Sequence, residues 1–281
     1  MSQCQTGQNE DPGSGQVKLP AVRLAGVVFH ALTEAQCIEH IISRSLAGCG
    51  GWVVTANLDH LRRLVREESY AQLCADATMV VADGMPLIWA SRIQGTPLPQ
   101  RVAGSIMVWK LSAAAADRGR SVFLLGGSPG TADAAAKVLK ERSPDLRIAG
   151  THCPPMGFEL DQAKVDQIVD LLISVKPDII YVGLGSPKQE QLAKDLRKLL
   201  PGAWWIGVGV SFSFLSGDVR RAPSWMQSLG LEWVHRLVQE PRRLAGRYLV
   251  QGCPFAARLL ASAVVGRLRA AFGGRKGDQG M

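Results

Sequence analysis

Four apolar segments decide the fold of this chain: SVFLLGG (121–127), LRIAGT (146–151), DIIYVGLG (178–185) and WWIGVGV (204–210). The intervening sequence is amphipathic and long enough for helices. Short apolar runs that alternate with amphipathic stretches are typical of a mostly parallel sheet covered by helices on both faces. We therefore predict an α/β fold, a layered Rossmann-like sheet in which ligands bind beyond the carboxyl ends of the strands.

The same alternation extends toward the N-terminus. We predict strands near 22–29, 52–55, 78–82, 121–125, 147–151, 178–183 and 204–208. Thr33, Ser128 and Ser186 stand where helix N-caps are expected, ahead of helices near 34–46, 130–142 and 188–199.

The length of 281 residues and the hydrophobic content of 47% suit one α/β domain with an appendage. We expect a disordered N-terminal tail (1–20), an α/β core (21–217), a helical basic appendage (218–272) and a disordered C-terminal tail (273–281). Residues 1–20 lack the basic and apolar regions of a secretion signal. The six cysteines show no zinc-binding spacing, which favours a reducing cytoplasm.

The positive charge of the chain is concentrated near its C-terminus. The net charge is +8, and residues 219–276 hold eleven Lys or Arg side chains against two Glu. This concentration indicates contact with an anionic surface. Four apolar or aromatic residues of this segment share one side: Trp233, Leu237, Leu244 and Tyr248. On one interpretation the segment is an interfacial amphipathic structure. On the other it is a helical hairpin that packs on the core and has a solvated basic face.

No apolar run in this region reaches the roughly 20 residues that cross a bilayer. The best candidate, Leu259–Val265, lies between Arg258 and Arg267. We therefore expect peripheral contact with the membrane surface and no membrane span.

Two glycine-rich turns follow predicted strands and open predicted helices. The first contains Gly126 and Gly127, and the second contains Gly185, Ser186, Lys188, Gln189 and Glu190. Such turns let backbone N–H groups approach a phosphate. Neither has the GxGxxG or GK[ST] pattern, so a bare tight turn is an equal alternative for the first, and Glu190 either binds ligand or caps its helix.

Other polar residues lie at strand ends or in a neighbouring loop. Asp83 follows a predicted strand and is either a general base or part of an Asp-Gly turn. Thr55 and Asn57 bind ligand or cap a helix, and Arg101 binds phosphate or forms a surface salt bridge. His60 and His152 have no recognisable nucleophile partner, so we assign neither to a catalytic triad.

Several of these segments together resemble the WecG/TagA/CpsF glycosyltransferase family. The similar segments are TANLDHL (55–61), ADGMPLIWASRIQG (82–95), RVAGS (101–105), VFLLGGSPG (122–130), KPDIIYVGLGSPKQE (176–190), WIGVGVSFSFLSGDVRRAP (205–223) and EPRRLAGRYL (240–249). The resemblance covers roughly Leu24 to Leu249, with the motifs in order.

The resemblance implies an inverting transfer of a hexosyl or N-acetylhexosaminyl group from a UDP-sugar to a polyprenyl-diphosphate-linked saccharide. The product would enter an exopolysaccharide or another cell-surface polysaccharide. It further implies an enzyme on the inner face of the bacterial cytoplasmic membrane, and a C-terminal appendage that helps to complete the active site.

Individual roles follow from the same resemblance. Asp83 would be the base, with Thr55 and Asn57 beside the donor sugar and the acceptor hydroxyl. The family is not known for a DxD metal motif and none is present here, so we expect no metal and no cofactor. The tail arginines would act on diphosphates or lipid headgroups: Arg220, Arg221, Arg236, Arg243 and Arg247.

One departure affects the expected specificity. Ile106 stands where many family members have an acidic residue. The donor sugar, the acceptor glycan and the linkage therefore stay open.

Two rival functions remain. The doubly wound half alone also suits an NAD(P)-dependent oxidoreductase, and the basic tail suits a non-catalytic module that binds anionic lipid or nucleic acid. On the transferase interpretation we expect no nucleic-acid partner, and a homo-oligomer is compatible with the sequence.

Overall fold

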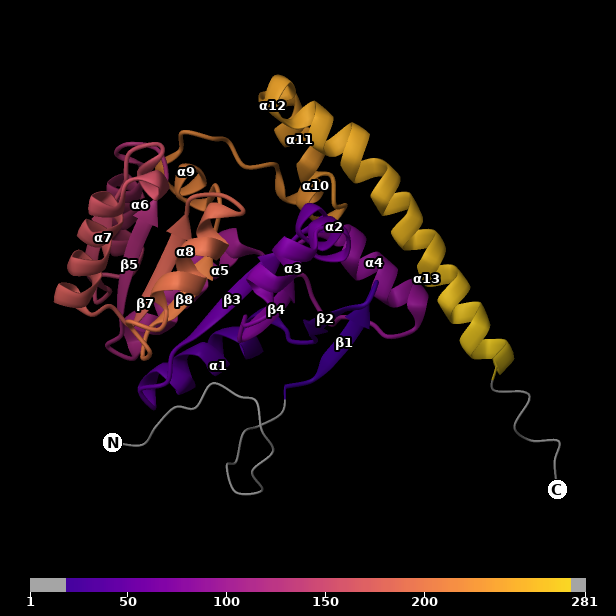
Figure 1. Cartoon of the computed structure of the whole chain (residues 1–281), viewed down its shortest axis with the longest axis horizontal. Helices are drawn as coiled ribbons and strands as arrows, with labels where there is room; N and C mark the ends of the chain where they lie inside the picture. Colours follow the sequence, from indigo (N-terminus) through magenta and orange to yellow (C-terminus); the bar gives the residue numbers. More distant parts are fainter. Residues whose placement is uncertain (1–18, 274–281) are drawn as a thin grey trace.

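The computed structural model describes residues 19–273 of the chain (Figure 1). The predicted tails at 1–20 and 273–281 lie outside the described residues, apart from positions 19, 20 and 273. The predicted core and appendage, 21–217 and 218–272, fall within them.

A parallel six-stranded sheet forms the centre of the molecule. Its strands are β3 (Gly51–Ala56), β4 (Met79–Ala82), β5 (Ser121–Gly126), β6 (Arg147–His152), β7 (Ile179–Gly183) and β8 (Trp204–Gly207). The spatial order is β4-β3-β8-β7-β5-β6, and each neighbouring pair runs parallel. This arrangement confirms the predicted Rossmann-like α/β class.

Helices cover both faces of the sheet, as Figure 1 shows. One face packs against α1 (Glu34–Leu46), α5 (Gly104–Asp117), α6 (Thr131–Arg142) and α9 (Ser211–Ser216). The other packs against α2 (Leu58–Arg66), α3 (Glu68–Cys74), α4 (Met85–Gln94), α7 (Gln162–Val175) and α8 (Lys188–Leu196). A short 3₁₀ helix spans Phe158–Leu160. Because the central strands of the sheet are buried on both faces, their sequences are continuous apolar runs.

Only one of the three predicted N-caps caps its helix. Thr33 and Gln36 form a capping box at the start of α1. Helix α6 instead begins after Gly130, which adopts the left-handed conformation, and Ser128 contributes only its carbonyl oxygen, to the Thr131 N–H and hydroxyl. The Ser186 hydroxyl is bound by α2 and α3 and does not cap α8.

The predicted strand at 22–29 is wrong. The chain reverses there to form an antiparallel hairpin of β1 (Ala21–Leu24) and β2 (Val27–His30), separate from the main sheet. Ala25 and Gly26 both have positive φ, 49° and 86°, as a two-residue hairpin turn requires. The continuous apolar pattern concealed this turn. His30 Nδ1 accepts a hydrogen bond of 3.1 Å from the Val80 N–H, so the hairpin covers the β4 edge of the sheet.

The C-terminal part is helical. It comprises α10 (Ser224–Ser228), α11 (Glu232–Gln239), α12 (Pro241–Ala245), a π-helical segment (Gly246–Gly252) and α13 (Cys253–Gly273). Pro241 begins α12 and marks its separation from α11. Pro254 does not end the helix. It is the second residue of α13, just after the π-helical segment, and the helix continues beyond it.

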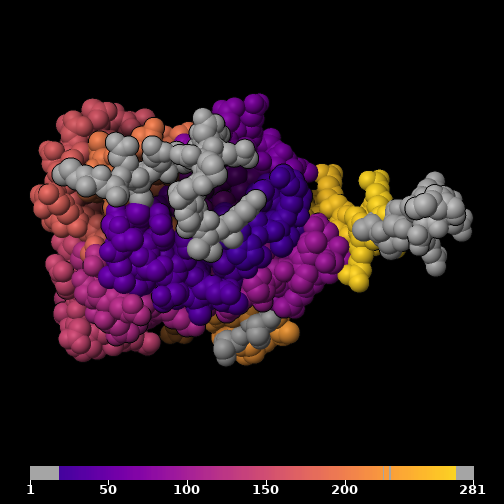
Figure 2. Space-filling model, turned by 90° about the horizontal axis from the view of Figure 1, so that it is seen from below, coloured from indigo at the N-terminus to yellow at the C-terminus, as the bar shows by residue number. Residues whose placement is uncertain are grey.

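Helix α13 packs along α4 and then extends beyond the body of the protein (Figures 1 and 2). Phe255, Leu259 and Ala263 are buried on its core-facing side, whereas Val264 and Leu268 are exposed. Among the described residues, one helix is long enough and apolar enough to cross a membrane, and it spans Pro241–Arg269. The expectation that no segment meets this criterion is therefore wrong, because the single charge of Arg258 does not divide the apolar stretch.

Gly126 is required where β5 meets β7. Its φ is +103°, and an added Cβ would lie 2.8 Å from the Gly183 carbonyl carbon. We expect Gly126→Ala to lower the free energy of unfolding by about 1–3 kcal/mol, because it combines backbone strain with a backbone clash. Chemical denaturation would measure the loss.

Gly119→Ala is the matched control, since Gly119 also has a positive φ, +63°, but no atom within 4 Å of the added Cβ. An equal loss in both variants would show that the close approach of β5 to β7 is unimportant.

Candidate active site beneath the C-terminal helices

A cavity of about 400 Å³ opens at the carboxyl ends of β3, β4 and β8. Its lining comes mainly from residues within the segments 55–60, 83–89, 208–214, 230–236 and 247–256. The first three follow sheet strands, as the parallel fold predicts, and the last two belong to the C-terminal helices. The cavity is therefore formed jointly by the sheet and the C-terminal helices.

Asp83 lines this cavity just after β4. Its N–H donates to the Ala56 carbonyl oxygen over 2.8 Å, and its Oδ2 accepts a bond of 3.3 Å from the Gly104 N–H. Burial raises the pKa of Asp83; the positive charge of Arg101 opposes this rise, and the negative charge of Glu232 adds to it. A carboxylate with a raised pKa is a stronger base toward a hydroxyl group in the cavity.

Thr55 and Asn57 both line the cavity, but the Thr55 hydroxyl and the Asn57 side-chain oxygen already have partners. The Thr55 hydroxyl donates to the Gly207 carbonyl oxygen over 2.8 Å, linking the ends of β3 and β8. Asn57 caps α2 by accepting from the Asp59 and His60 N–H groups. The capping alternative is therefore confirmed for Asn57. Contact of either residue with substrate stays a prediction.

Arg101 lines the cavity beside Asp83 and forms an ion pair. Its Nη1 lies 3.1 Å from Glu232 Oε2, and Arg221 Nε lies 3.6 Å from Glu232 Oε1. Arg101 belongs to the core, whereas Arg221 and Glu232 lie in the C-terminal segment. Arg101 thus forms a salt bridge, but the pair is mostly buried and faces the cavity, unlike the surface pair that was the alternative. Phosphate binding by Arg101 stays a prediction.

Two further arginines line the cavity from the C-terminal helices. Arg247 Nη2 lies 2.9 Å from Asp59 Oδ2, and Arg236 Nη2 lies 3.7 Å from Glu240 Oε1. Within the described residues, the buried Nε atoms of Arg236 and Arg247 have no hydrogen-bond partner. Unpaired buried N–H groups are costly, so this wall suits an anionic ligand.

Comparison with known proteins identifies the family of this chain. Residues 22–269 match the model of the glycosyl transferase WecG/TagA/CpsF family. The chain belongs to this family. It is therefore a glycosyltransferase.

Three similar proteins carry the name N-acetylglucosaminyldiphosphoundecaprenol N-acetyl-beta-D-mannosaminyltransferase. The Bacillus spizizenii protein is 31% identical over 69% of this chain and 73% of its own length. The Bacillus subtilis protein is 29% identical over 73% and 77%, and a Staphylococcus aureus protein is 29% identical over 79% and 86%, respectively.

The glycine-rich turns of this WecG/TagA/CpsF-family protein lie outside the cavity lining. Gly126 and Gly127 pack against β7 and Phe212, and the Gly127 N–H donates to the Gly183 carbonyl oxygen. Gly185 precedes a cis peptide bond between Ser186 and Pro187, and Lys188 pairs with Glu159 near the surface. From the second turn and its helix, Gln189 alone of the described residues lines the cavity. The structure thus separates the glycines and Lys188 from Asp83, whereas Gln189 lines the same cavity as Asp83. The role of all these residues in donor binding stays a prediction.

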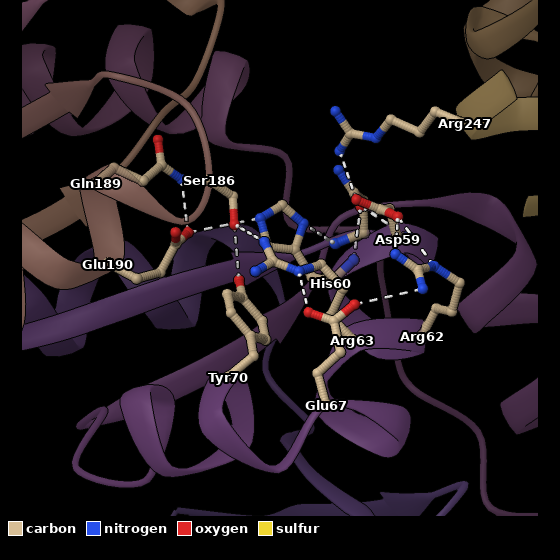
Figure 3. A network of polar contacts seen from close by, with 11 residues as sticks. Asp59, His60, Arg62, Arg63, Glu67, Tyr70, Ser186, Gln189, Glu190 and Arg247 are labelled. Atoms are coloured by element: carbon tan, nitrogen blue, oxygen red, sulfur yellow. Dashed lines mark hydrogen bonds and ion pairs between the residues drawn. The ribbon is translucent and has the colours of Figure 1, made fainter. Parts of the chain in front are cut away.

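A polar network joins residues of α2, α3 and α8 with Ser186 and Arg247 (Figure 3), and several of its members line the cavity. His60 Nε2 lies 3.5 Å from Glu190 Oε1, and the Gln189 side chain donates to the same carboxylate. Burial raises the pKa of Glu190, but hydrogen bonds and charge from His60, with bonds from Gln189 and Ser186, lower it overall. Glu190 is therefore held as a buried carboxylate that positions His60.

Ser186 extends this network to the next helices. Its hydroxyl accepts from Arg63 Nη1 over 2.8 Å and lies 3.0 Å from the Tyr70 hydroxyl. Ser186 and Glu190 thus support the wall from behind and do not line it.

Of the five predicted tail arginines, Arg236 and Arg247 line the cavity and Arg221 reaches it through Glu232. Arg220 and Arg243 are exposed outside it. Ile106 lines a separate groove on the other side of Arg101.

Sequence reasoning missed several residues of this site. Glu232, Trp233, Tyr248 and His60 line the cavity, yet none was assigned a role there. Trp233 and Tyr248 pack edge to face with ring centres 6.1 Å apart, and the amphipathic pattern had placed them on one side. His60 had a local signal, because it completes the Asn57 capping box. Glu232 had no local signal in the sequence, because Arg101 is distant from it in the chain and its spacing from Arg221 matches no recognised motif.

Proposed function

We propose that this enzyme transfers a hexosyl or N-acetylhexosaminyl group from a UDP-sugar to a polyprenyl-diphosphate-linked saccharide, with inversion at the anomeric carbon. The observation that carries the proposal is a half-buried carboxylate with a raised pKa, Asp83, in a cavity whose wall includes arginines with unpaired N–H groups. The names of the relatives, which specify an N-acetylglucosaminyl-diphosphate lipid acceptor, support the acceptor class. The product would serve exopolysaccharide or other cell-surface polysaccharide synthesis.

In the proposed mechanism, Asp83 accepts the proton of the attacking acceptor hydroxyl. The hydroxyl oxygen then forms a bond to the anomeric carbon of the donor. The bond between that carbon and the phosphate oxygen breaks on the opposite side, and its electron pair leaves with UDP. Attack opposite to departure inverts the configuration, so one carboxylate suffices where a covalent intermediate would require a nucleophile as well.

The arginines would stabilise the charge that develops on the departing diphosphate. Arg236 and Arg247 already have unpaired N–H groups, and Arg101 lies on the Asp83 side of the cavity. Guanidinium groups match phosphate oxygens in bidentate geometry. Preorganised positive charge of this kind lowers the barrier without a bound metal ion. Covering of the cavity by the C-terminal helices would also protect the donor from water.

Isothermal titration with a panel of UDP-sugars tests this function. We expect UDP and one UDP-sugar to bind, with the same affinity in the presence of EDTA. Binding of NADH alone would support the oxidoreductase alternative and contradict our proposal. Binding only to anionic lipid, with no nucleotide affinity even when acceptor is added, would support the non-catalytic alternative.

We also propose that the enzyme is peripheral on the inner face of the cytoplasmic membrane. One side of α13 is committed to the core through Phe255 and Leu259, so lipid cannot surround this helix without undocking it. Exposed apolar residues such as Val250 and Leu268, with nearby exposed arginines, suit the headgroup region.

The outward arginines Arg242 and Arg243 provide a test of membrane contact. Both are exposed on α12. We expect the protein to sediment with vesicles containing anionic lipid and to be released by salt, because each basic residue near such a surface contributes about 1 kcal/mol. Changing both to Ala should weaken this binding about tenfold or more.

Neutral vesicles are the control for that experiment, because they lack the attracting charge. Equal binding of the double variant, or retention of the wild-type protein at high salt, would contradict a peripheral electrostatic contact.

A further inference from the structure

Glu232 is the first residue of α11 and joins two parts of the molecule. Its two carboxylate oxygens contact different arginines: Oε2 lies 3.1 Å from Arg101, and Oε1 lies 3.6 Å from Arg221. The side chains of Glu232 and Arg101 are only 20% and 14% exposed. Glu232 is thus a largely buried anion shared by two cations at the cavity wall.

The position of this cluster relates it to Asp83. Arg101, Glu232 and Asp83 all line the same cavity. Among the described residues, no ion pair joins Arg101 to Asp83, and the Arg101 guanidinium pairs with Glu232. The orientation of Arg101 near the proposed base is therefore set by a residue of the C-terminal helices.

We propose that Glu232 is a positioning residue that fixes Arg101 and Arg221 in the cavity wall and so couples docking of the C-terminal helices to catalysis. This inference rests on the proposed function. When α11 is docked, Glu232 aligns both guanidinium groups. When α11 is displaced, Arg101 loses the acceptor that holds it.

Two physical consequences separate this role from a purely structural one. Removing the carboxylate leaves two mostly buried guanidinium groups without their shared acceptor, which disturbs the geometry of both. It also removes a negative charge that contributes to the raised pKa of Asp83. The first consequence affects turnover, and the second affects the pH at which Asp83 becomes a base.

Glu232→Gln tests both consequences in the full-length protein. We expect kcat/KM for the donor to fall about tenfold or more, mainly through kcat. The acidic limb of the kcat/KM profile should move to lower pH, because Asp83 then loses its proton more readily. Glu232→Asp keeps the charge and should leave the limb near its wild-type pH while recovering part of kcat.

Glu240→Gln is the matched control, since Glu240 also contacts two arginines, Arg236 and Arg243. Both of these partners belong to the C-terminal helices, so the control breaks a similar cluster without affecting Arg101. The acidic limb should not move in this variant.

If Glu232→Gln does not fold, Arg221→Gln keeps the inference testable. The negative charge of Glu232 then has lost one of its two compensating cations, so the limb should move in the opposite direction, to higher pH. If the Arg221→Gln variant folds and the acidic limb of its kcat/KM profile stays at the wild-type pH, the inference is overturned.

A lower KM with unchanged kcat in Glu232→Gln would also overturn it, because Glu232 would then be a competitor of substrate for the arginines. Absence of transfer by the wild-type protein would instead contradict the proposed function itself.

Discussion

Asp83→Asn should reduce kcat by about 10²–10⁴-fold, because the cavity then loses the group that accepts the acceptor proton. The amide retains an oxygen that accepts from the Gly104 N–H, so the loop geometry and the affinity for UDP should persist. Steady-state kinetics with titration of UDP would separate the two effects. Near-normal turnover would show that another group is the base.

The same substitution should stabilise the ligand-free protein at neutral pH. Burial raises the pKa of Asp83, so the folded state binds this proton more tightly than the unfolded state does. The wild-type protein therefore loses stability as the pH rises through the folded-state pKa. Asn removes that cost, and we expect a gain of about 0.5–2 kcal/mol that disappears below about pH 4.

Thermal unfolding across this pH range measures the difference. Asp117→Asn is the control, since Asp117 is exposed at the end of α5. An equal stability gain in both variants would show that the gain does not come from the burial of the Asp83 carboxylate.

Replacing Arg236 and Arg247 together with Ala should lower kcat/KM by about 10²-fold or more, since a hydrogen bond to a charged group contributes about 1.5–3 kcal/mol. Both residues line the cavity, and each has a buried Nε without a partner among the described residues. The corresponding Lys variants should recover only part of the loss, because lysine lacks bidentate geometry. Kinetics with a short-chain, water-soluble acceptor would measure this without a membrane.

The paired control is the double change of Arg242 and Arg243 to Ala. These residues carry the same total charge but lie exposed on α12, outside the cavity lining. Their loss should leave transfer to the soluble acceptor within about twofold of wild type, as expected for exposed charges. Equal losses in both double variants would show that only the net charge of the C-terminal helices matters.

The parallel sheet was predictable because its strands are local apolar runs. Strands β5 and β7, for example, are buried on both faces and read directly from SVFLLGG and DIIYVG. The β1–β2 hairpin was not, because its turn uses Ala25 at positive φ beside a single glycine. Local patterns predict elements well when the local residues also determine the backbone conformation.

The site was only partly predictable for a related reason. Asp83, Thr55 and Asn57 lie at strand ends, and the parallel topology brings those ends together. The glycine-rich turns follow the same rule, but they lie after β5 and β7, away from the Asp83 cavity. Glu232 depends on the docking of α11 against the core, and no local pattern encodes that contact.

Transfer with simultaneous analysis of the product tests the central claim most directly. Wild-type enzyme and Asp83→Asn would be incubated with UDP-N-acetylmannosamine, the other UDP-sugars of the panel, and a short-chain polyprenyl-diphosphate N-acetylglucosamine. We predict that the wild-type enzyme forms one disaccharide of inverted anomeric configuration, seen by mass spectrometry and NMR, and that the variant forms almost none. Retained configuration, or equal product from Asp83→Asn, would contradict the account.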